Sequence, residues 1–294
     1  MLTDLYVVKT EGLNVRSAPL VKDDNRIAAI ALGDVVAKID VTPDEDWWKI
    51  SIRHGGEVIE GFVAKNFLEP APKLVQAIGW FKEQFRGKIE SAIAGTPFTL
   101  DLLTAIAVQE TYYIWGKLYP TLPLSEVLKV CVGDTFDAPN RSAFPTNKDD
   151  LLAVTGGKEM FDIAREALIA VGAHIKIYKD RADADSNKFC RGFGIFQLDL
   201  QFFKDDPDYF LQKKWHSFDE CLKKVIPELK DALKRAYKTE KKALTEEEQV
   251  YVAIAYNRGS VDFSRGFKQG HKDEEGKYYG EYIWEYLQLA RSVP

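Results

Sequence analysis

Three short segments of the chain carry residue types that can do chemistry together. Residues 105–111 read Ala-Ile-Ala-Val-Gln-Glu-Thr and place Glu110 at the end of an apolar helical pattern. Residues 192–197 read Gly-Phe-Gly-Ile-Phe-Gln, in which the glycines permit a tight turn and Gln197 offers both a hydrogen-bond donor and an acceptor. Residues 255–259 read Ala-Tyr-Asn-Arg-Gly and place Tyr256 and Asn257 near the end of a helix. These segments predict a proton-donating carboxyl group beside polar side chains that bind or orient a substrate.

Glu110 is the candidate general acid. A glutamate exposed to water is ionised at neutral pH, so a proton donor needs a raised pKa. Burial against Ile106 and Val108 disfavours the charged form, and a position at the C-terminal end of a helix would act in the same direction. Glu166 is an alternative acid, but its place beside Arg165 within a helical pattern is typical of a surface position.

The N-terminal quarter of the chain has a strand-like pattern. Short β-rich runs, separated by Asp, Gly and Pro, occupy residues 6–8, 13–16, 35–39, 48–52 and 61–63. Pro70 and Pro72 then favour an extended connection. The sequence therefore predicts an α+β protein with a small closed β-barrel over residues 1–69, a linker over residues 70–76 and a mostly helical domain over residues 77–294.

Helical signals dominate the second domain. Thr99 is a candidate N-cap for a helix over residues 100 to about 110. Thr245 and Glu248 form a capping box that begins another helix. A long amphipathic helix is indicated by an apolar stripe at steps of three and four residues, which consists of Phe218, Cys221, Leu222, Val225, Leu229 and Leu233.

Composition excludes several classes of function. The 294 residues are 46% hydrophobic and 29% charged, as in ordinary globular proteins, and the net charge of −5 disfavours nucleic acid as a partner. No apolar run approaches the ~20 residues of a membrane helix, and the first residues do not form a secretory signal, so we expect synthesis in the cytoplasm. Three cysteines and four scattered histidines lack zinc or His-Glu-x-x-His spacing, so neither a metal nor a cofactor is expected.

Residues 12–19, 32–34, 48–50 and 61–63 together resemble the bacterial Src-homology-3-like domain. The resemblance covers about residues 3–69. Domains of that family often accompany enzymes that cut the bacterial cell wall and are thought to bind wall peptides. It implies a wall-binding module at the N-terminus of this chain.

The segments around Glu110, Gln197 and Tyr256, in that order, resemble the lysozyme-like superfamily, specifically lytic transglycosylases and goose-type lysozymes. The resemblance implies cleavage of the peptidoglycan glycan strand between N-acetylmuramic acid and N-acetylglucosamine, with Glu110 as the general acid. It further implies that Gln197 contacts substrate, that Tyr256 and Asn257 orient the acid or the sugar, and that Tyr282 corresponds to a tyrosine that follows in those families.

The identity of a second catalytic carboxylate stays open. Hydrolysis with inversion needs one ~6.5–9.5 Å from the acid, whereas a lytic transglycosylase uses the 6-hydroxyl of the sugar itself. Asp183 and Asp185 lie roughly where goose-type lysozymes place an aspartate, and Asp185 is our candidate, with Asp134 as a further possibility. Glu110 and Gln197 are 87 positions apart, so residues 112–190 must form an insertion or an elaborated lobe.

Two other functions remain possible from the sequence. Cys190, followed by Arg-Gly-Phe, faintly resembles the start of the cell-wall cysteine peptidases, but Gly194 makes the helix that should follow a poor one. A non-catalytic wall-binding protein with a lysozyme-like fold is the other. In each case the expected partner is peptidoglycan, which the protein would reach by a non-classical route.

Overall fold

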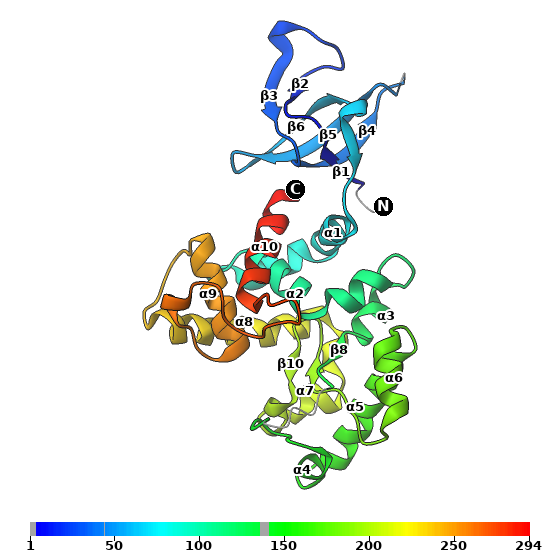
Figure 1. The fold of residues 1–294 in the computed structure, drawn as a ribbon, viewed down its shortest axis with the longest axis vertical. Coiled ribbons are helices and arrows are strands. Elements are labelled where there is room, and N and C mark those ends of the chain that lie inside the picture. Colours follow the sequence, from blue (N-terminus) through cyan, green and yellow to red (C-terminus); the bar gives the residue numbers. More distant parts are fainter. Residues whose placement is uncertain (1–3, 44, 136–140) are drawn as a thin grey trace.

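A seven-stranded antiparallel sheet forms one end of the molecule. The computed structural model describes residues 4–43, 45–135 and 141–294, so residues 1–3 and 44 of the predicted barrel lie outside it (Figure 1). The strand order is β3-β2-β6-β5-β4-β1-β7. The strands are β1 (Leu5–Val8), β2 (Leu13–Arg16), β3 (Arg26–Ile30), β4 (Val35–Val41), β5 (Trp47–His54), β6 (Glu57–Ala64) and β7 (Leu68–Pro70).

The predicted closed barrel is not found. In the part of the chain that the structure describes, β3 and β7 each pair with one neighbour, so the sheet has two edges. Its own small core is built from alternating side chains such as Val15, Ile50 and Val63. Between β5 and β6, Gly55 and Gly56 both have positive φ, as the two-residue turn of a tight hairpin requires.

Helices make up most of the remaining chain. Ten α-helices lie within the described residues: α1 (Lys73–Ile93), α2 (Leu100–Leu118), α3 (Leu124–Lys129), α4 (Lys148–Leu152), α5 (Gly157–Gly172), α6 (Lys176–Ala184), α7 (Pro207–Leu211), α8 (Phe218–Tyr237), α9 (Glu246–Arg258) and α10 (Tyr279–Ser292). Short 3₁₀ helices cover Asp23–Asn25, Lys65–Phe67, Leu200–Lys204, Lys214–His216 and Phe263–Arg265. None of these helices is long and apolar enough to cross a bilayer.

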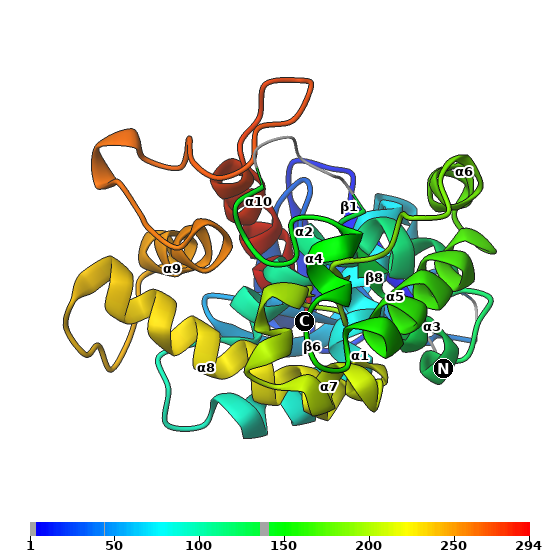
Figure 2. The same cartoon turned by 90° about the horizontal axis from the view of Figure 1, so that it is seen from below.

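A small second sheet lies within the helical part. It consists of β8 (Val132–Gly133), β9 (Gly192–Phe193) and β10 (Leu198–Asp199) in the order β10-β9-β8. Figure 2 shows α8 and α9 on one side of α2 and α10, and α4, α5 and α6 on the other. The predicted lobe over residues 112–190 thus contains the end of α2, helices α3 to α6 and strand β8, while residues 136–140 lie outside the described chain.

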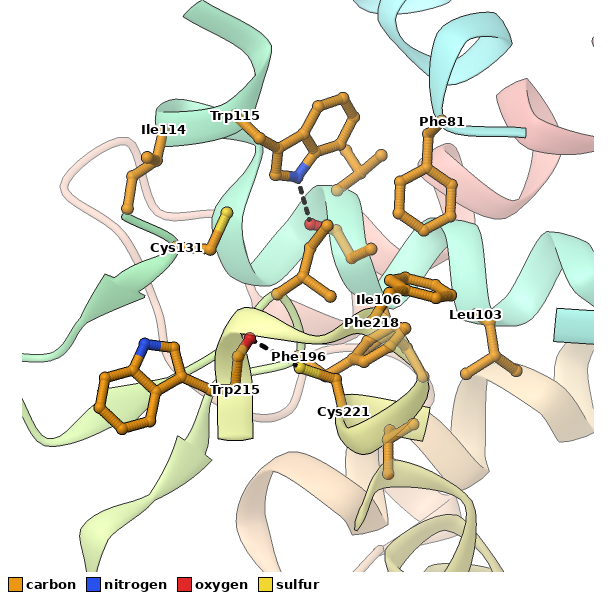
Figure 3. Close-up of a cluster of buried hydrophobic side chains, with 14 of the residues drawn as sticks. Phe81, Leu103, Ile106, Ile114, Trp115, Cys131, Phe196, Trp215, Phe218 and Cys221 are labelled. Atoms are coloured by element: carbon orange, nitrogen blue, oxygen red, sulfur yellow. Dashed lines mark hydrogen bonds between the residues drawn. The ribbon is translucent and has the colours of Figure 1, made fainter. Parts of the chain in front are cut away.

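Helix α2 is the central buried element. It packs against α1 and α10, and most of its side chains are buried. Trp115 is fully buried and its Nε1 donates to the carbonyl oxygen of Ala107 at 3.1 Å, while Cys221 Sγ donates to the carbonyl oxygen of Trp215 (Figure 3). These tryptophans therefore belong to the core.

Several predicted boundaries are confirmed and two are wrong. The Thr99 N-cap, the buried stripe of α8 and the capping box of Thr245 and Glu248 are all present. However, α1 begins at Lys73, so most of the predicted linker is helical. Helix α2 continues to Leu118, because tertiary packing outweighs the low helix propensity of the β-branched and aromatic residues that follow Glu110.

The sheet is joined to the helices by a buried polar network. Asp101, at the start of α2, pairs with Arg53 of β5 at 3.1 Å and with Lys82 of α1 at 2.7 Å. Lys82 Nζ also donates to the carbonyl oxygens of Ala290 and Val293 at the end of α10. The start of α2 and the end of α10 are therefore fixed to each other and to the sheet.

Candidate active site

A cleft of about 660 Å³ opens over the middle of α2. It is lined by four of the predicted site residues, namely Glu110, Gln197, Tyr256 and Asn257. These come from α2, the turn between β9 and β10, and α9, which are far apart in the chain. The other lining residues are Tyr113, Asp134, Gly192, Leu198, Asp199, Gln201, Phe202, Glu228, Arg235, Arg258 and Gly259.

Glu110 lies on the cleft side of α2 with its side chain largely buried. Its Oε1 accepts a hydrogen bond from the hydroxyl of Tyr279, the first residue of α10, at 3.0 Å. Burial raises the pKa of Glu110 from 4.5 to about 7, the hydrogen bond from Tyr279 opposes that shift, and the charge of Asp134 adds to it. The carboxyl group is thus protonated in a large fraction of molecules near neutral pH.

The prediction that the helix dipole raises the pKa of Glu110 is wrong. Glu110 lies eight residues before the end of α2 at Leu118 rather than at the helix terminus. Helix-end effects fall off within the last turn, so they do not reach Glu110. Burial is therefore the main cause of the raised pKa of Glu110, and it depends on how α2 packs against its neighbours.

Gln197 is held in a strained turn at the cleft. Its backbone φ is +53°, a conformation that is uncommon for residues other than glycine and clusters at functional sites. Its Nε2 donates to the carbonyl oxygen of Gly194 at 2.8 Å. A Cβ atom on Gly192 would lie 2.3 Å from Gln197 Oε1, and one on Gly133 would lie 2.7 Å from it. Glycine at both positions gives this amide room to lie against the sheet.

Two hydrogen bonds fix the Gln197 turn to the helices that carry the other site residues. The hydroxyl of Tyr256 donates to the carbonyl oxygen of Phe196 at 2.7 Å, which joins α9 to the turn. Thr111 Oγ1 donates to the carbonyl oxygen of Ile195 at 2.7 Å, which joins α2 to it. Tyr256 thus fixes the turn, and the charge of Glu110 adds to burial in raising the pKa of Tyr256, while Asn257 is exposed at the cleft.

Tyr282 and Asp185 do not join the site. The Tyr282 hydroxyl donates to the carboxylate of Asp273, away from the residues that line the cleft. Asp185 ends α6, where its Oδ1 accepts from the backbone N–H of Asn187 at 2.8 Å. The tyrosine that contacts Glu110 is Tyr279, three residues before the predicted one.

Of the aspartates that the sequence put forward as a second carboxylate, Asp134 lines the cleft. It follows β8 with a φ of +48°, and 41% of its side chain is exposed. Partial burial raises its pKa; Arg141 opposes this shift, and Asp199 adds to it. Arg141 lies 2.7 Å from Asp199 and 3.4 Å from Asp134, so it holds the two carboxylates on the same side of the cleft.

The alternative chemistries find no support in the geometry. Cys190 is fully buried, which raises the pKa of its thiol and keeps it protonated. Glu166 is 68% exposed and pairs with Lys213 outside the cleft. Across residues 4–43, 45–135 and 141–294, no group of three or more His, Cys, Asp or Glu side chains is placed to hold a metal ion.

Three further cleft residues were not predicted from the sequence. Glu228 and Arg235 lie on α8, seven residues apart and therefore on one face of the helix, and Arg258 is the last residue of α9. For Arg258 the sequence held one signal for a place in the cleft, since this residue directly follows Asn257. Glu228 and Arg235 could be assigned only once the packing of α8 was known.

The chain was compared with known proteins. No protein-family model matches it, and searches of the curated proteins and of the solved structures return no significant match. The function proposed below therefore rests on the geometry of the cleft and on the sequence resemblances.

Proposed function

We propose that this protein cleaves the glycan strand of peptidoglycan, with Glu110 as the general acid. The observation that carries the proposal is a carboxyl group, raised to a pKa of about 7 by burial, at the surface of a large polar cleft. Breaking a glycosidic bond requires protonation of the leaving oxygen, which such a group can supply near neutral pH.

Gln197 and Asn257 are proposed to bind the sugars on either side of the acid. Gln197 uses its Nε2 within the protein, which leaves its Oε1 as an acceptor for a sugar hydroxyl or amide. Asn257 is exposed and offers both a donor and an acceptor. Tyr279 would hold the Glu110 carboxyl in one orientation through its hydrogen bond to Oε1.

For the second carboxylate, Asp134 replaces Asp185. Asp134 lines the cleft and can activate a water molecule if the reaction is a hydrolysis. A lytic transglycosylase needs no such base, because the 6-hydroxyl of the sugar attacks and leaves an anhydro end. Asp134→Asn would abolish a hydrolytic reaction and spare a transglycosylase reaction, so product analysis of this variant separates the two mechanisms.

The N-terminal sheet is proposed to be a Src-homology-3-like module that binds the wall. The sequence resemblance over residues 3–69 supports this. Trp48 packs against Tyr6 with ring centroids 4.6 Å apart, and Lys38 lies over the same indole, which forms a partly exposed aromatic surface suited to a peptide. This part of the proposal predicts that Trp48→Ala binds the isolated cell wall more weakly than wild type does.

Clearing of a peptidoglycan suspension tests the activity. Wild type should clear it, and Glu110→Gln should lose the clearing by at least about 100-fold, the usual contribution of a general acid. Glu166→Gln is the matched control, because it makes the same change at the exposed alternative acid. A wild type that binds the wall and does not clear it would identify a non-catalytic wall-binding protein instead.

A further inference from the structure

Two arginines bring positive charge to the end of the cleft formed by α8 and α9, where their charges also act on the carboxyl groups of Glu228 and Asp262. Arg235 and Arg258 both line the cleft there. Within the described residues, neither guanidinium forms an ion pair with an acidic side chain. At the opposite end of the cleft, beside the small sheet, the arginine is neutralised, because Arg141 is paired with Asp199 and Asp134. The two ends of the cleft therefore differ in their free charge.

Arg258 is held in place by a neutral partner. Its Nη1 donates to Oε1 of Gln269 at 3.0 Å. Gln269 is 1% exposed, and its amide is fixed by bonds to Asp262 and Gly266 of the surrounding loop. A buried amide orients the guanidinium without neutralising it, which leaves the rest of its planar set of donors for a ligand.

Arg235 has only a weak partner of its own. Its Nη2 lies 3.5 Å from the carbonyl oxygen of Ala255 in α9, at the limit of a hydrogen bond. Glu228 lies two helical turns earlier on α8; burial raises its pKa and the charge of Arg235 opposes that shift, but the two side chains form no close ion pair within the described residues. Within the part of the chain that the structure describes, this contact with a C-terminal carbonyl of α9 uses one N–H of Arg235, and its other donors face the cleft without a hydrogen-bond partner.

We propose that Arg235 and Arg258 form a subsite for a carboxylate carried by the glycan strand. This inference rests on the proposed function and names the class of strand that the cleft prefers. In peptidoglycan the lactyl branch of N-acetylmuramic acid supplies such a group in two ways: as a carboxyl of the stem peptide, or as its own carboxyl when the peptide is absent. Two arginines suit this ligand because the guanidinium matches a carboxylate with two parallel hydrogen bonds.

Four substrates test the subsite and separate the two sources. They are strands with stem peptides, strands freed of peptides by an amidase, and each of these with its carboxyl groups converted to methylamides. Wild type should lose about tenfold in kcat/KM on a methylamidated strand relative to its parent, mainly through KM. The parent that shows the larger loss identifies which carboxyl is bound.

Arginine variants complete the test. Arg235→Gln and Arg258→Gln should each lose about tenfold on the parent strand and little on its methylamide. Arg265→Gln is the matched control, because Arg265 is an exposed arginine outside the cleft lining, and it should behave as wild type. Circular dichroism of the variants checks that they fold.

The outcomes distinguish this inference from the proposed function. If wild type cleaves methylamidated and parent strands at the same rate, or if the arginine variants lose the same factor on both, the subsite is refuted while glycan cleavage stands. If wild type releases no glycan fragments from any of the four substrates, the proposed function itself fails and the inference fails with it.

Discussion

Replacing Glu110 with glutamine should stabilise the protein, and increasingly so as pH rises. Burial raises the pKa of this carboxyl from 4.5 to about 7. Between these two values the folded protein binds more protons than the unfolded chain, so the stability of wild type falls as pH rises through this window. Glutamine stays neutral at every pH and keeps an Oε1 that can accept from Tyr279.

The size of the effect follows from the two pKa values. The difference between these pKa values lowers the free energy of unfolding of wild type by about 1 kcal/mol at pH 5 and about 3 kcal/mol at pH 8, because the unfolded chain ionises more readily than the folded protein. The free energy of unfolding of Glu110→Gln should therefore exceed that of wild type by about 2 kcal/mol more at pH 8 than at pH 5. Replacing a buried ionisable group of a functional site commonly raises the free energy of unfolding and lowers activity.

Urea denaturation of both proteins at pH 5 and pH 8 measures this difference directly. Glu166→Gln is the control; because the Glu166 side chain is 68% exposed and pairs with Lys213 at the surface, the change should affect stability by less than about 1 kcal/mol at either pH. The reasoning is refuted if Glu110→Gln differs from wild type by the same amount at both pH values. In that case the Glu110 carboxyl would not be held protonated by burial.

Three further substitutions test the surroundings of the site. Tyr279→Phe removes a hydrogen bond that favours the charged form of Glu110, so the loss of activity at alkaline pH should move to higher pH, and an unchanged pH–rate profile would contradict the contact. Gly192→Ala places a Cβ 2.3 Å from Gln197 Oε1 and should raise KM. Its control is Gly87→Ala, in an open position of α1, which should leave KM unchanged and stabilise the protein by about 0.5–1 kcal/mol. Equal KM values for Gly192→Ala and wild type would refute the packing argument. Lys82→Met leaves Asp101 without its buried partner and should lower the free energy of unfolding in urea by about 3 kcal/mol, and an unaffected stability would show that Lys82 does not hold the start of α2 to α1 and α10.

Local signals in the sequence were enough to find much of the site. An apolar run before Glu110, a glycine-rich turn before Gln197 and a capped helix that ends near Asn257 are all short-range patterns, and the structure brings these residues to one cleft. The two α-helical caps were predictable for the same reason, since an N-cap depends on three or four neighbouring residues.

What could not be predicted depends on how distant elements pack. Tyr279 contacts Glu110 across 169 positions of sequence, and only the position of α10 beside α2 distinguishes it from Tyr282 on the same helix. The pairing of Arg141 with Asp134 and Asp199 likewise depends on the small sheet. The open edges of the N-terminal sheet were missed because strand patterns do not specify whether the first and last strands pair.

The central claim is that Glu110 protonates a glycosidic bond of peptidoglycan. Mass spectrometry of the fragments released from purified peptidoglycan by wild type and by Glu110→Gln tests it most directly. The account predicts new saccharide ends at N-acetylmuramic acid with wild type, either anhydro or reducing, and none with Glu110→Gln. Fragments that are free peptides, or saccharide ends that Glu110→Gln releases as fast as wild type, would contradict it.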